Sequence, residues 1–314
     1  MNRIRIVCAV GIWCFLAGAG GIARAGEIYW TEQSLAAPAI ARADVADMSR
    51  QVVIDTGLTA PFRIAVDPLS ARMFWTNLST GEIQSATLDG SDVQTIVGPV
   101  GRTRSGLTVD IQRQRIYWAD QDQVWRANLD GSGAELVFSI GGTAFIQDLT
   151  LDPVGGYVYA SDFSGMGQGQ LLRATLDGED LTVLRDGIED GPVGLAVDSA
   201  GGRVYWTTFD IFDGTGSVNW TSLDGATWDT LWTGDDNFDD LVIDAEHGML
   251  YWTAIDVLSN TGNIQRMAFD GSAHEVFSYD GRIPAGIAWV PEPSAAVLLL
   301  ASGLVLLRRR TSTH

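Results

Sequence analysis

Apolar and aromatic residues recur in a fixed block along the chain between Gly26 and Val290. Each block joins an apolar residue, an aromatic residue, a tryptophan or its substitute, and a small residue. The six copies are residues 28–31 (IYWT), 73–76 (MFWT), 116–119 (IYWA), 158–161 (VYAS), 204–207 (VYWT) and 250–253 (LYWT). The tryptophan position falls at residues 30, 75, 118, 160, 206 and 252, so successive copies lie 42 to 46 residues apart. A period of this length indicates a repeat architecture.

Two further elements keep the same period. An apolar-Asp-Gly sequence, which is a strong hairpin signal between apolar runs, follows the aromatic block at residues 88–90, 129–131, 176–178, 223–225 and 269–271. The first unit has Ala46-Asp47-Met48 there instead. A short apolar segment ending in Asp precedes the block at residues 64–67, 107–110, 149–152, 195–198 and 241–244. Its sixth copy, residues 287–290, comes at the end of the repeat and has no Asp.

The repeat predicts strands and no helices. Each unit supplies the apolar-Asp strand, the aromatic strand, a strand leading into the Asp-Gly turn and a strand after it. The last of these is expected at residues 94–97, 135–138, 182–184, 230–232 and 275–277. No window between residues 26 and 290 keeps the 3.6-residue apolar period of a helix. Four short strands per unit are typical of a β-propeller, so we predict an all-β, six-bladed propeller over residues 26–290.

The order of the strands also predicts how the ring closes. The repeat begins with an aromatic strand and ends with a lone apolar strand at residues 286–289. We expect this last strand to complete the first blade, so that three strands come from the N-terminus and one from the C-terminus. Such closure pairs strand edges that would otherwise be exposed.

The residues of the block resemble a known family. An apolar-Tyr-Trp-Thr block, preceded by an apolar-Asp strand and followed by Leu-Asp-Gly, resembles the YWTD propeller of low-density-lipoprotein receptors and its bacterial relatives. The resemblance covers residues 26–290 and implies six blades. The residue after the small one varies among the units and is Glu32, Asn77, Asp120, Asp162, Thr208 or Ala254. Because the aromatic residues recur once per blade, we interpret them as packing between blades and not as a ligand cage.

The N-terminus predicts a secretory signal over residues 1–25. A basic start, Met1 to Arg5, precedes an apolar stretch from Ile6 to Ala23. Ala23-Arg24-Ala25 has the small-x-small form of a cleavage site, so we expect the mature chain to begin at Gly26. A membrane anchor is the alternative, but the apolar stretch is short and rich in Ala and Gly.

The C-terminal tail, residues 291–314, predicts export and sorting. Pro291, Glu292 and Pro293 are followed by an apolar stretch to Leu307 and by three arginines, residues 308–310. By composition alone this is a tail anchor or a sorting signal. The order of the three features resembles the PEP-CTERM signal of Gram-negative bacteria. The resemblance implies transient anchoring in the inner membrane through a transmembrane helix, recognition by exosortase-type machinery, removal of the tail, and delivery to the outer surface or extracellular matrix. It also implies extracellular polysaccharide or a surface protein as partner.

Composition narrows the function further. The chain has no lysine, and between residues 26 and 290 it has 14 arginines against 38 acids, a net charge of −24. A body this acidic is not expected to bind nucleic acid. Its two cysteines, Cys8 and Cys14, lie in the predicted signal, and only His247 and His274 precede the C-terminal histidine. Thiol chemistry, Cys-ligated metals and multi-His sites are therefore disfavoured.

Charged residues break the repeat just before the inner strands. Three units have glycine at this position and three have a charged residue: Gly106, Gly194 and Gly286 against Arg63, Asp148 and Asp240. Inner strands surround the axial channel of a propeller, so the three charged side chains should project near one mouth of it. Two interpretations remain open: an internal salt bridge that plugs the channel, or a site for a polar ligand.

Two other irregularities are candidate sites. Asp235, Asp236, Asn237 and Asp239 could offer oxygen ligands to Ca²⁺, although they lack the Gly and distal Glu of an EF-hand loop, and a solvated acidic loop is the alternative. Long insertions after the aromatic block, at residues 162–169, 208–216 and 254–262, are expected on one side of the ring as a partner-facing surface.

Two classes of function fit these features. The first, which we favour, is a non-catalytic binding or scaffold protein of the cell surface with no obligatory cofactor. The alternative is a propeller hydrolase or lyase with a metal held by carboxylates at the channel mouth. Fold alone does not choose between them, but half of the channel positions are glycine and no histidine lies near them.

Overall fold

The computed structural model describes residues 26–34, 37–99, 104–163, 169–210, 213–256, 259–279 and 281–291. The predicted signal peptide and the tail beyond Pro291 lie outside these residues, and so do parts of the predicted insertions. Within the described ranges, every regular element that was assigned is a strand or a turn. The described part of the chain contains no helix with the length and apolarity needed to cross a membrane.

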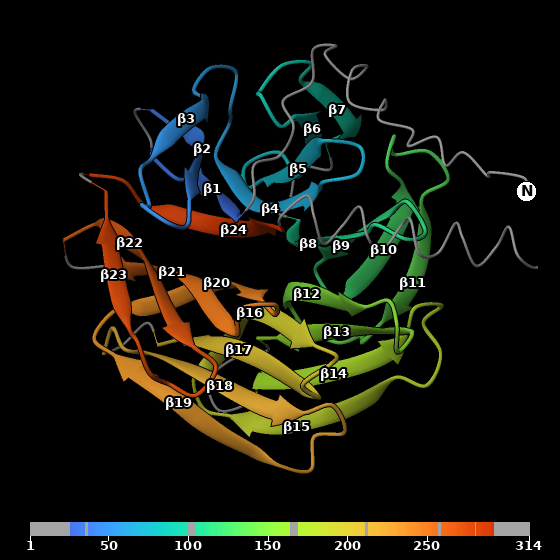
Figure 1. Cartoon of the computed structure of the whole chain (residues 1–314). Helices are drawn as coiled ribbons and strands as arrows, with labels where there is room; N and C mark the ends of the chain where they lie inside the picture. The colour runs from blue at the N-terminus through green and yellow to red at the C-terminus, as the bar shows by residue number, and fades with distance from the viewer. Residues whose placement is uncertain are drawn as a thin grey trace, which may run out of the picture.

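Six four-stranded antiparallel sheets surround a central axis (Figure 1). Blades one to three contain β24 (Pro284–Val290), β1 (Glu27–Glu32), β2 (Ala39–Asp44) and β3 (Gln51–Ile54); β4 (Pro61–Asp67), β5 (Arg72–Asn77), β6 (Ile83–Thr87) and β7 (Gln94–Val97); and β8 (Ser105–Asp110), β9 (Arg115–Asp120), β10 (Gln123–Asn128) and β11 (Glu135–Ser139). Blades four to six contain β12 (Ile146–Asp152), β13 (Tyr157–Asp162), β14 (Gly169–Thr175) and β15 (Thr182–Ile188); β16 (Gly191–Asp198), β17 (Arg203–Phe209), β18 (Gly216–Ser222) and β19 (Trp228–Gly234); and β20 (Asn237–Asp244), β21 (Met249–Asp256), β22 (Thr261–Ala268) and β23 (Glu275–Ser278). The predicted six-bladed propeller is confirmed.

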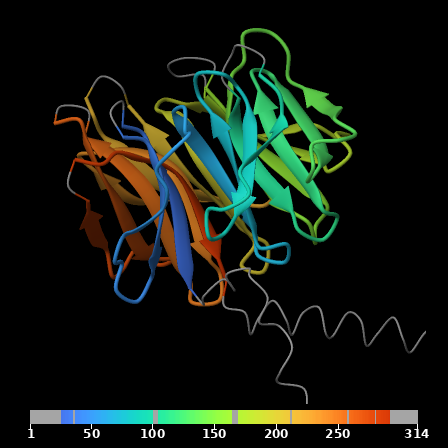
Figure 2. The ribbon, with the colours of Figure 1, turned by 90° about the horizontal axis from the view of Figure 1, so that it is seen from above.

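The ring closes through blade one, as the sequence predicts. Its sheet has the order β24-β1-β2-β3, so the last strand of the repeat lies against the first. In this antiparallel pair Glu27 is opposite Val290 and Trp30 is opposite Ile287. Both ends of the ring therefore leave it side by side, at the face where the inner strands end (Figure 2).

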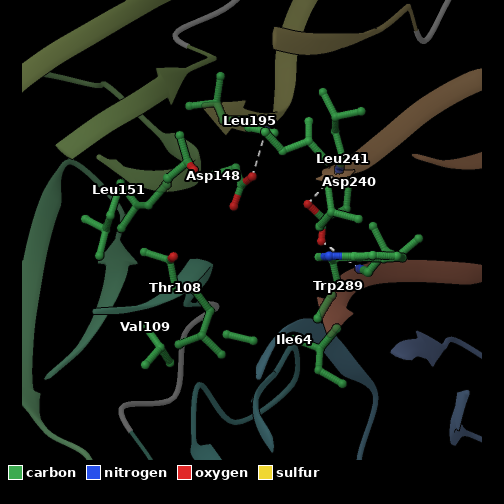
Figure 3. Close-up of a pocket in the computed structure, with 18 of the residues that line it drawn as sticks. Ile64, Thr108, Val109, Asp148, Leu151, Leu195, Asp240, Leu241 and Trp289 are labelled. Atoms are coloured by element: carbon green, nitrogen blue, oxygen red, sulfur yellow. Dashed lines mark hydrogen bonds between the residues drawn. The ribbon is translucent and has the colours of Figure 1, made fainter. Parts of the chain in front are cut away.

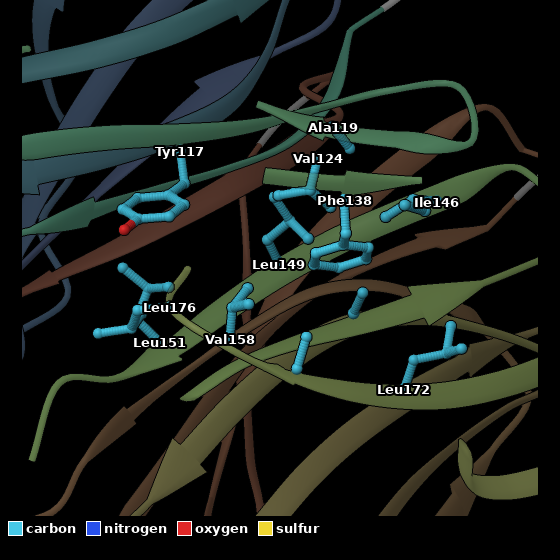
Figure 4. Packing of buried hydrophobic residues seen from close by; sticks show 12 residues of the cluster. Tyr117, Ala119, Val124, Phe138, Ile146, Leu149, Leu151, Val158, Leu172 and Leu176 are labelled. Carbon is cyan, nitrogen blue, oxygen red and sulfur yellow. The ribbon is translucent and has the colours of Figure 1, made fainter. Parts of the chain in front are cut away.

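The aromatic block packs between blades, which confirms its structural interpretation. Six apolar clusters each join two neighbouring blades. Tyr29 packs toward blade two in the cluster that contains Trp75, whereas the adjacent Trp30 packs toward blade six with Tyr251. Successive residues of a strand point to opposite faces of the sheet, so one Tyr-Trp pair serves two interfaces. Figure 4 shows the interface of blades three and four, where Phe138 contacts the apolar side chains of the next blade.

The small residue of the block joins the blades by hydrogen bonds. The Thr253 hydroxyl accepts from the N–H of Asp240 at 3.0 Å and donates to the carbonyl of Ala285 in the next blade at 2.6 Å. Thr31, Ser161 and Thr207 likewise donate to a carbonyl of the next blade. Blade three has Ala119 at this position, and the hydroxyl of Ser105, directly opposite it, takes over the donation to the next blade. The motif threonine is thus an inter-blade connector.

Replacing Thr253 by valine should destabilise the propeller by about 2 kcal/mol, because a buried N–H and a buried carbonyl both lose their partner. Thr253 is fully buried, and valine keeps its shape. Urea unfolding of the two proteins measures the difference. Thr233→Val, an exposed threonine on β19, is the matched control and should change stability by less than about 0.5 kcal/mol. Equal effects of the two substitutions would contradict the role of the hydroxyl.

The Asp-Gly turns also contact the neighbouring blade. Gly178 has φ +85°, and a Cβ there would lie 1.9 Å from the carbonyl oxygen of Val137 in the preceding blade. Arginines on the third strand fix the same contact from the other side. Arg126 and Arg173 donate to the carbonyls of Leu176 and Leu223 in the next blade, at 2.8 and 2.7 Å. Glycine is therefore needed here for its backbone angle and for the close approach of two blades.

Candidate functional site in the axial channel

The alternation of charge and glycine around the axis has a steric cause. A Cβ at Gly106 would lie 2.9 Å from the Cα of Asp148 in the next blade. A Cβ at the other two glycines would meet the Cα of the charged residue in the next blade at 2.8 Å; the pairs are Gly194 with Asp240 and Gly286 with Arg63. The inner strands are too close at this level for side chains at all six positions. Three side chains fill the centre, and three glycines let the strands meet.

The structure brings Arg63 and the two acids together in part as predicted. Arg63 is 1% exposed, and its Nε lies 3.9 Å from Oδ1 of Asp148. Its shortest ion pair, 2.7 Å from Nη2 to Oδ1, is with Asp239 across the channel. This partner was not predicted, because Asp239 was expected to belong to a calcium loop. A signal for Asp239 exists in the sequence, because the equivalent position is uncharged in the other five blades, as Phe62, Ser105, Gln147, Val193 and Ala285.

Backbone N–H groups orient the other two carboxylates. Oδ2 of Asp148 accepts from the N–H of Leu195 in the next blade at 2.8 Å. Oδ2 of Asp240 accepts from the N–H of Ile287 in blade one, also at 2.8 Å, and its Oδ1 accepts from Leu241 at 2.9 Å. These bonds fix both carboxylates on the inner wall of the ring without neutralising their charge.

The charges at this level do not balance. Burial raises the pKa of Asp148 well above its ordinary value, and the carboxylate of Asp240 raises it further, against the attraction of Arg63. Burial also raises the pKa of Asp240 to about 6; Arg63 lowers it and Asp239 adds to the rise. Burial by itself lowers the pKa of Arg63, but the three carboxylates raise it above its ordinary value. Arg63 therefore stays charged, and one cation faces three acids.

A cavity of about 220 Å³ lies along the axis beyond this charged level. The inner strands of all six blades form its wall, and most of the lining residues are apolar, but the surface that they present to the cavity is mostly polar. Figure 3 shows the carboxylates of Asp148 and Asp240 directed into the opening from two sides. Their residues are 4% and 5% exposed, whereas Trp289, near the end of β24, is only partly buried. The cavity is thus deep and has an acidic base.

The predicted calcium loop does not form one site. Asn237 and Asp239 belong to β20, which begins at Asn237, whereas Asp235 and Asp236 precede the strand. Asp236 accepts hydrogen bonds from amides of β22, Asp239 pairs with Arg63, and Asp235 lines a separate cavity near Asp190. Asn237 is fully buried. Among the residues that the structure describes, no three acidic, histidine or cysteine side chains come close enough to hold a metal ion.

The predicted insertions are in part longer hairpins. β21 and β22 remain paired out to Asp256 and Thr261, so most of the described residues of this segment are in strands. β17 likewise extends to Phe209. Phe163 packs against the backbone of the next blade and does not project toward a partner. A Cβ at Gly191, in that blade, would lie 2.1 Å from its ring. The hairpins project from the face opposite the two ends of the ring, since the second strand of each blade runs antiparallel to the inner strand.

Comparison with known proteins places the repeat. Residues 71–111 match the low-density lipoprotein receptor repeat class B. The chain is similar to low-density lipoprotein receptor-related protein 1 of Pyricularia oryzae, with 34% identity over 194 residues, 53% of this chain and 62% of that protein. It is also similar to Protein cueball of Drosophila persimilis, with 36% identity over 98 residues, 30% of this chain and 15% of that protein. The chain thus spans less than two thirds of the length of either relative.

Solved structures share the fold at low sequence identity. A chain of the nidogen/laminin complex superposes with a TM-score of 0.72 at 18% identity, covering 85% of this chain and 99% of that one. TolB from Acinetobacter baumannii superposes with a TM-score of 0.68 at 13% identity, covering 85% and 67%. At these identities the likeness concerns the fold alone.

Proposed function

We propose that the chain is an exported, non-catalytic binding or scaffold propeller of the cell surface, associated with exopolysaccharide or a surface protein. The observation that carries the proposal is the exit of both ends of the ring from one face, where Glu27 pairs with Val290. A tail that starts at Pro291 and is held in a membrane keeps this face toward the membrane. The opposite face, with the long hairpins, then points outward.

The outward face has features of a recognition surface. The hairpins of blades five and six carry Asp210, Asp213 and Asp256 near their ends, where side chains are exposed or partly exposed. Burial raises the pKa of the neighbouring Asp190, and the charges of Asp210 and Asp213 add to the rise. A surface with this charge favours a partner that carries positive charge. Binding surfaces on loops above a rigid scaffold are common in proteins.

A solved structure of similar fold belongs to a protein that binds another protein. The propeller of similar fold in the nidogen/laminin complex occurs in an assembly of two proteins. The matched stretches cover 62% of the Pyricularia protein and 15% of the Drosophila protein, so the functions of those proteins are not transferred to this chain.

Export and sorting can be tested in the native host. We expect the protein on the cell surface to begin at Gly26 and to lack residues 308–310 in mass spectrometry. Replacing Pro291, Glu292 and Pro293 by alanine should leave the protein in the cell envelope with its arginines retained. Alanine at residues 311–313 is the control within the same tail and should not change delivery. An intact chain of 314 residues in the cytosol would refute the proposal.

Binding and catalysis can be separated on the purified protein. Retention on extracellular matrix from the host, lost when residues 210–213 are replaced by a Gly-Ser linker, supports a binding role for the hairpin face. A broad hydrolase and lyase screen should show no turnover. Turnover that disappears in Asp148→Asn would instead favour the enzymatic alternative at the channel.

A further inference from the structure

The base of the axial cavity is short of positive charge. Arg63 directs its 2.7 Å bond at Asp239, which does not line the cavity. Asp148 and Asp240, which do line it, are left with backbone N–H donors and a guanidinium no closer than 3.9 Å to Asp148. The charged groups that act on the pair are Arg63 from β4 and Asp239 from β20, while β8, β16 and β24 contribute glycines at this level. Buried carboxylates that share a single guanidinium with a third carboxylate are incompletely neutralised, which is costly.

From this geometry we propose that the cavity binds a primary ammonium group on an alkyl stem. The ammonium supplies the missing charge and donates hydrogen bonds to the two carboxylates. Its stem lies along the wall formed by the inner strands, which has Leu149 and Leu241 among its residues. The inference rests on the binding role proposed above and assigns a ligand to the opposite face of the ring.

The dimensions and donor set favour this ligand over others. The cavity of about 220 Å³ has room for several water molecules at about 30 Å³ each, and therefore for one small organic cation. A calcium ion prefers six to eight oxygen ligands. The described residues bring no three acids together for a metal ion, whereas two carboxylates can each accept a hydrogen bond from an ammonium group, which has three N–H donors.

A proton should compete with the ammonium ion, because the two carboxyl groups are buried. Burial and mutual repulsion raise the pKa values of Asp148 and Asp240, the latter to about 6. With its pKa at about 6, Asp240 is mostly ionised at pH 7 and mostly protonated at pH 5, where the proton competes with the cation. For one competing proton, the affinity at pH 5 should be about tenfold lower than at pH 7.

Calorimetric titration of the purified protein with n-butylammonium chloride tests the inference. We expect saturable binding at pH 7, about tenfold weaker binding at pH 5, and net proton release when the heats are compared in buffers of different ionisation enthalpy. Asp148→Asn and Asp240→Asn should each abolish binding. Asp177→Asn, which removes the same charge from a side chain that is 77% exposed, should bind as the wild type does.

Titrations with other compounds identify which kind of molecule carries the ammonium group. If a lysine-containing peptide binds at the same site, the ligand is a lysine side chain of a protein. If only the free amine binds, the ligand is a small molecule. Either result supports the ammonium site. n-Butanol should not bind, because it has the stem without the charge. No saturable heat with the amine, unchanged binding in both Asn variants, or binding of calcium chloride in place of the amine would overturn the inference. Matrix retention by the hairpin face is measured separately, so either proposal can fail alone.

Discussion

Removing β24 should abolish cooperative folding of the propeller. This strand supplies the inner strand of blade one and buries Ile287 and Val290 at 2% and 0% exposure. One of its carbonyls accepts a hydrogen bond from the Thr253 hydroxyl, and two of its N–H groups donate to the Thr31 hydroxyl and to the carboxylate of Asp240. Its loss opens the ring and exposes the edge of β1. A chain ending at residue 283 should show a broad thermal transition by circular dichroism and a reduced urea m-value.

The matched control for this truncation is a chain ending at Val290. It lacks the same tail but keeps the closed ring, so it should unfold in one sharp transition. If the shorter chain melts as sharply as this control, the three-plus-one closure is not required for the fold. A separate peptide covering residues 284–290 should restore cooperativity only in the shorter chain.

Replacing Arg63 by alanine should destabilise the folded protein by about 3–5 kcal/mol at pH 7, because it removes one partner of a buried ion pair. Asp148, Asp239 and Asp240 would then repel one another without a counter-charge in a site that is at most 7% exposed. Urea unfolding at pH 7 measures the loss. If Arg63→Ala does not fold, the variant that also carries Asp239→Asn and Asp240→Asn should recover, because the uncompensated charges are gone. Stability within about 0.5 kcal/mol of the wild type would contradict a structural role for Arg63.

The loss should depend on pH with a defined sign. The pKa of Asp240 is about 6 in the folded protein and about 3.9 in an unfolded chain. Between these values the folded state binds more protons, so this group lowers stability as the pH rises from about 4 to above 6. Removing Arg63 raises the pKa of the pair further and makes this decline steeper. Asp240→Asn should flatten the profile and stabilise the protein at pH 8 relative to the wild type.

The fold was predictable because its signals repeat. Strand positions, the Asp-Gly turns and the lone strand at the end of the repeat each recur at a fixed offset, so an error in one unit is corrected by the other five. The inter-blade role of Tyr29 and Trp30 followed from the same regularity. The connecting role of Thr253 did not, because its partner carbonyl belongs to another blade and is not visible in a linear motif.

The site was predictable only at the positions that break the repeat. Arg63, Asp148 and Asp240 stood out against glycine and do lie together at the axis. The grouping of Asp235, Asp236, Asn237 and Asp239 as one calcium loop does not match the structure, because Asp236 contacts β22, Asp239 pairs with Arg63 and Asp235 lines a separate cavity. The cavity beyond the charged level could not be read from the sequence, since its wall is made of ordinary inner-strand residues.

The glycine and charge alternation has a consequence for how such a ring can be rebuilt. Along the rim the chain repeats blade by blade, but at the axis the smallest repeating piece is a pair of blades, one with glycine and one with a charged residue. Exchanging two adjacent blades would place two side chains where there is room for one. Duplication, deletion or recombination in this protein should therefore give a folded ring only when two neighbouring blades are added, removed or exchanged together. A ring of seven blades built from these sequences would place two glycines or two charged residues next to each other at its axis.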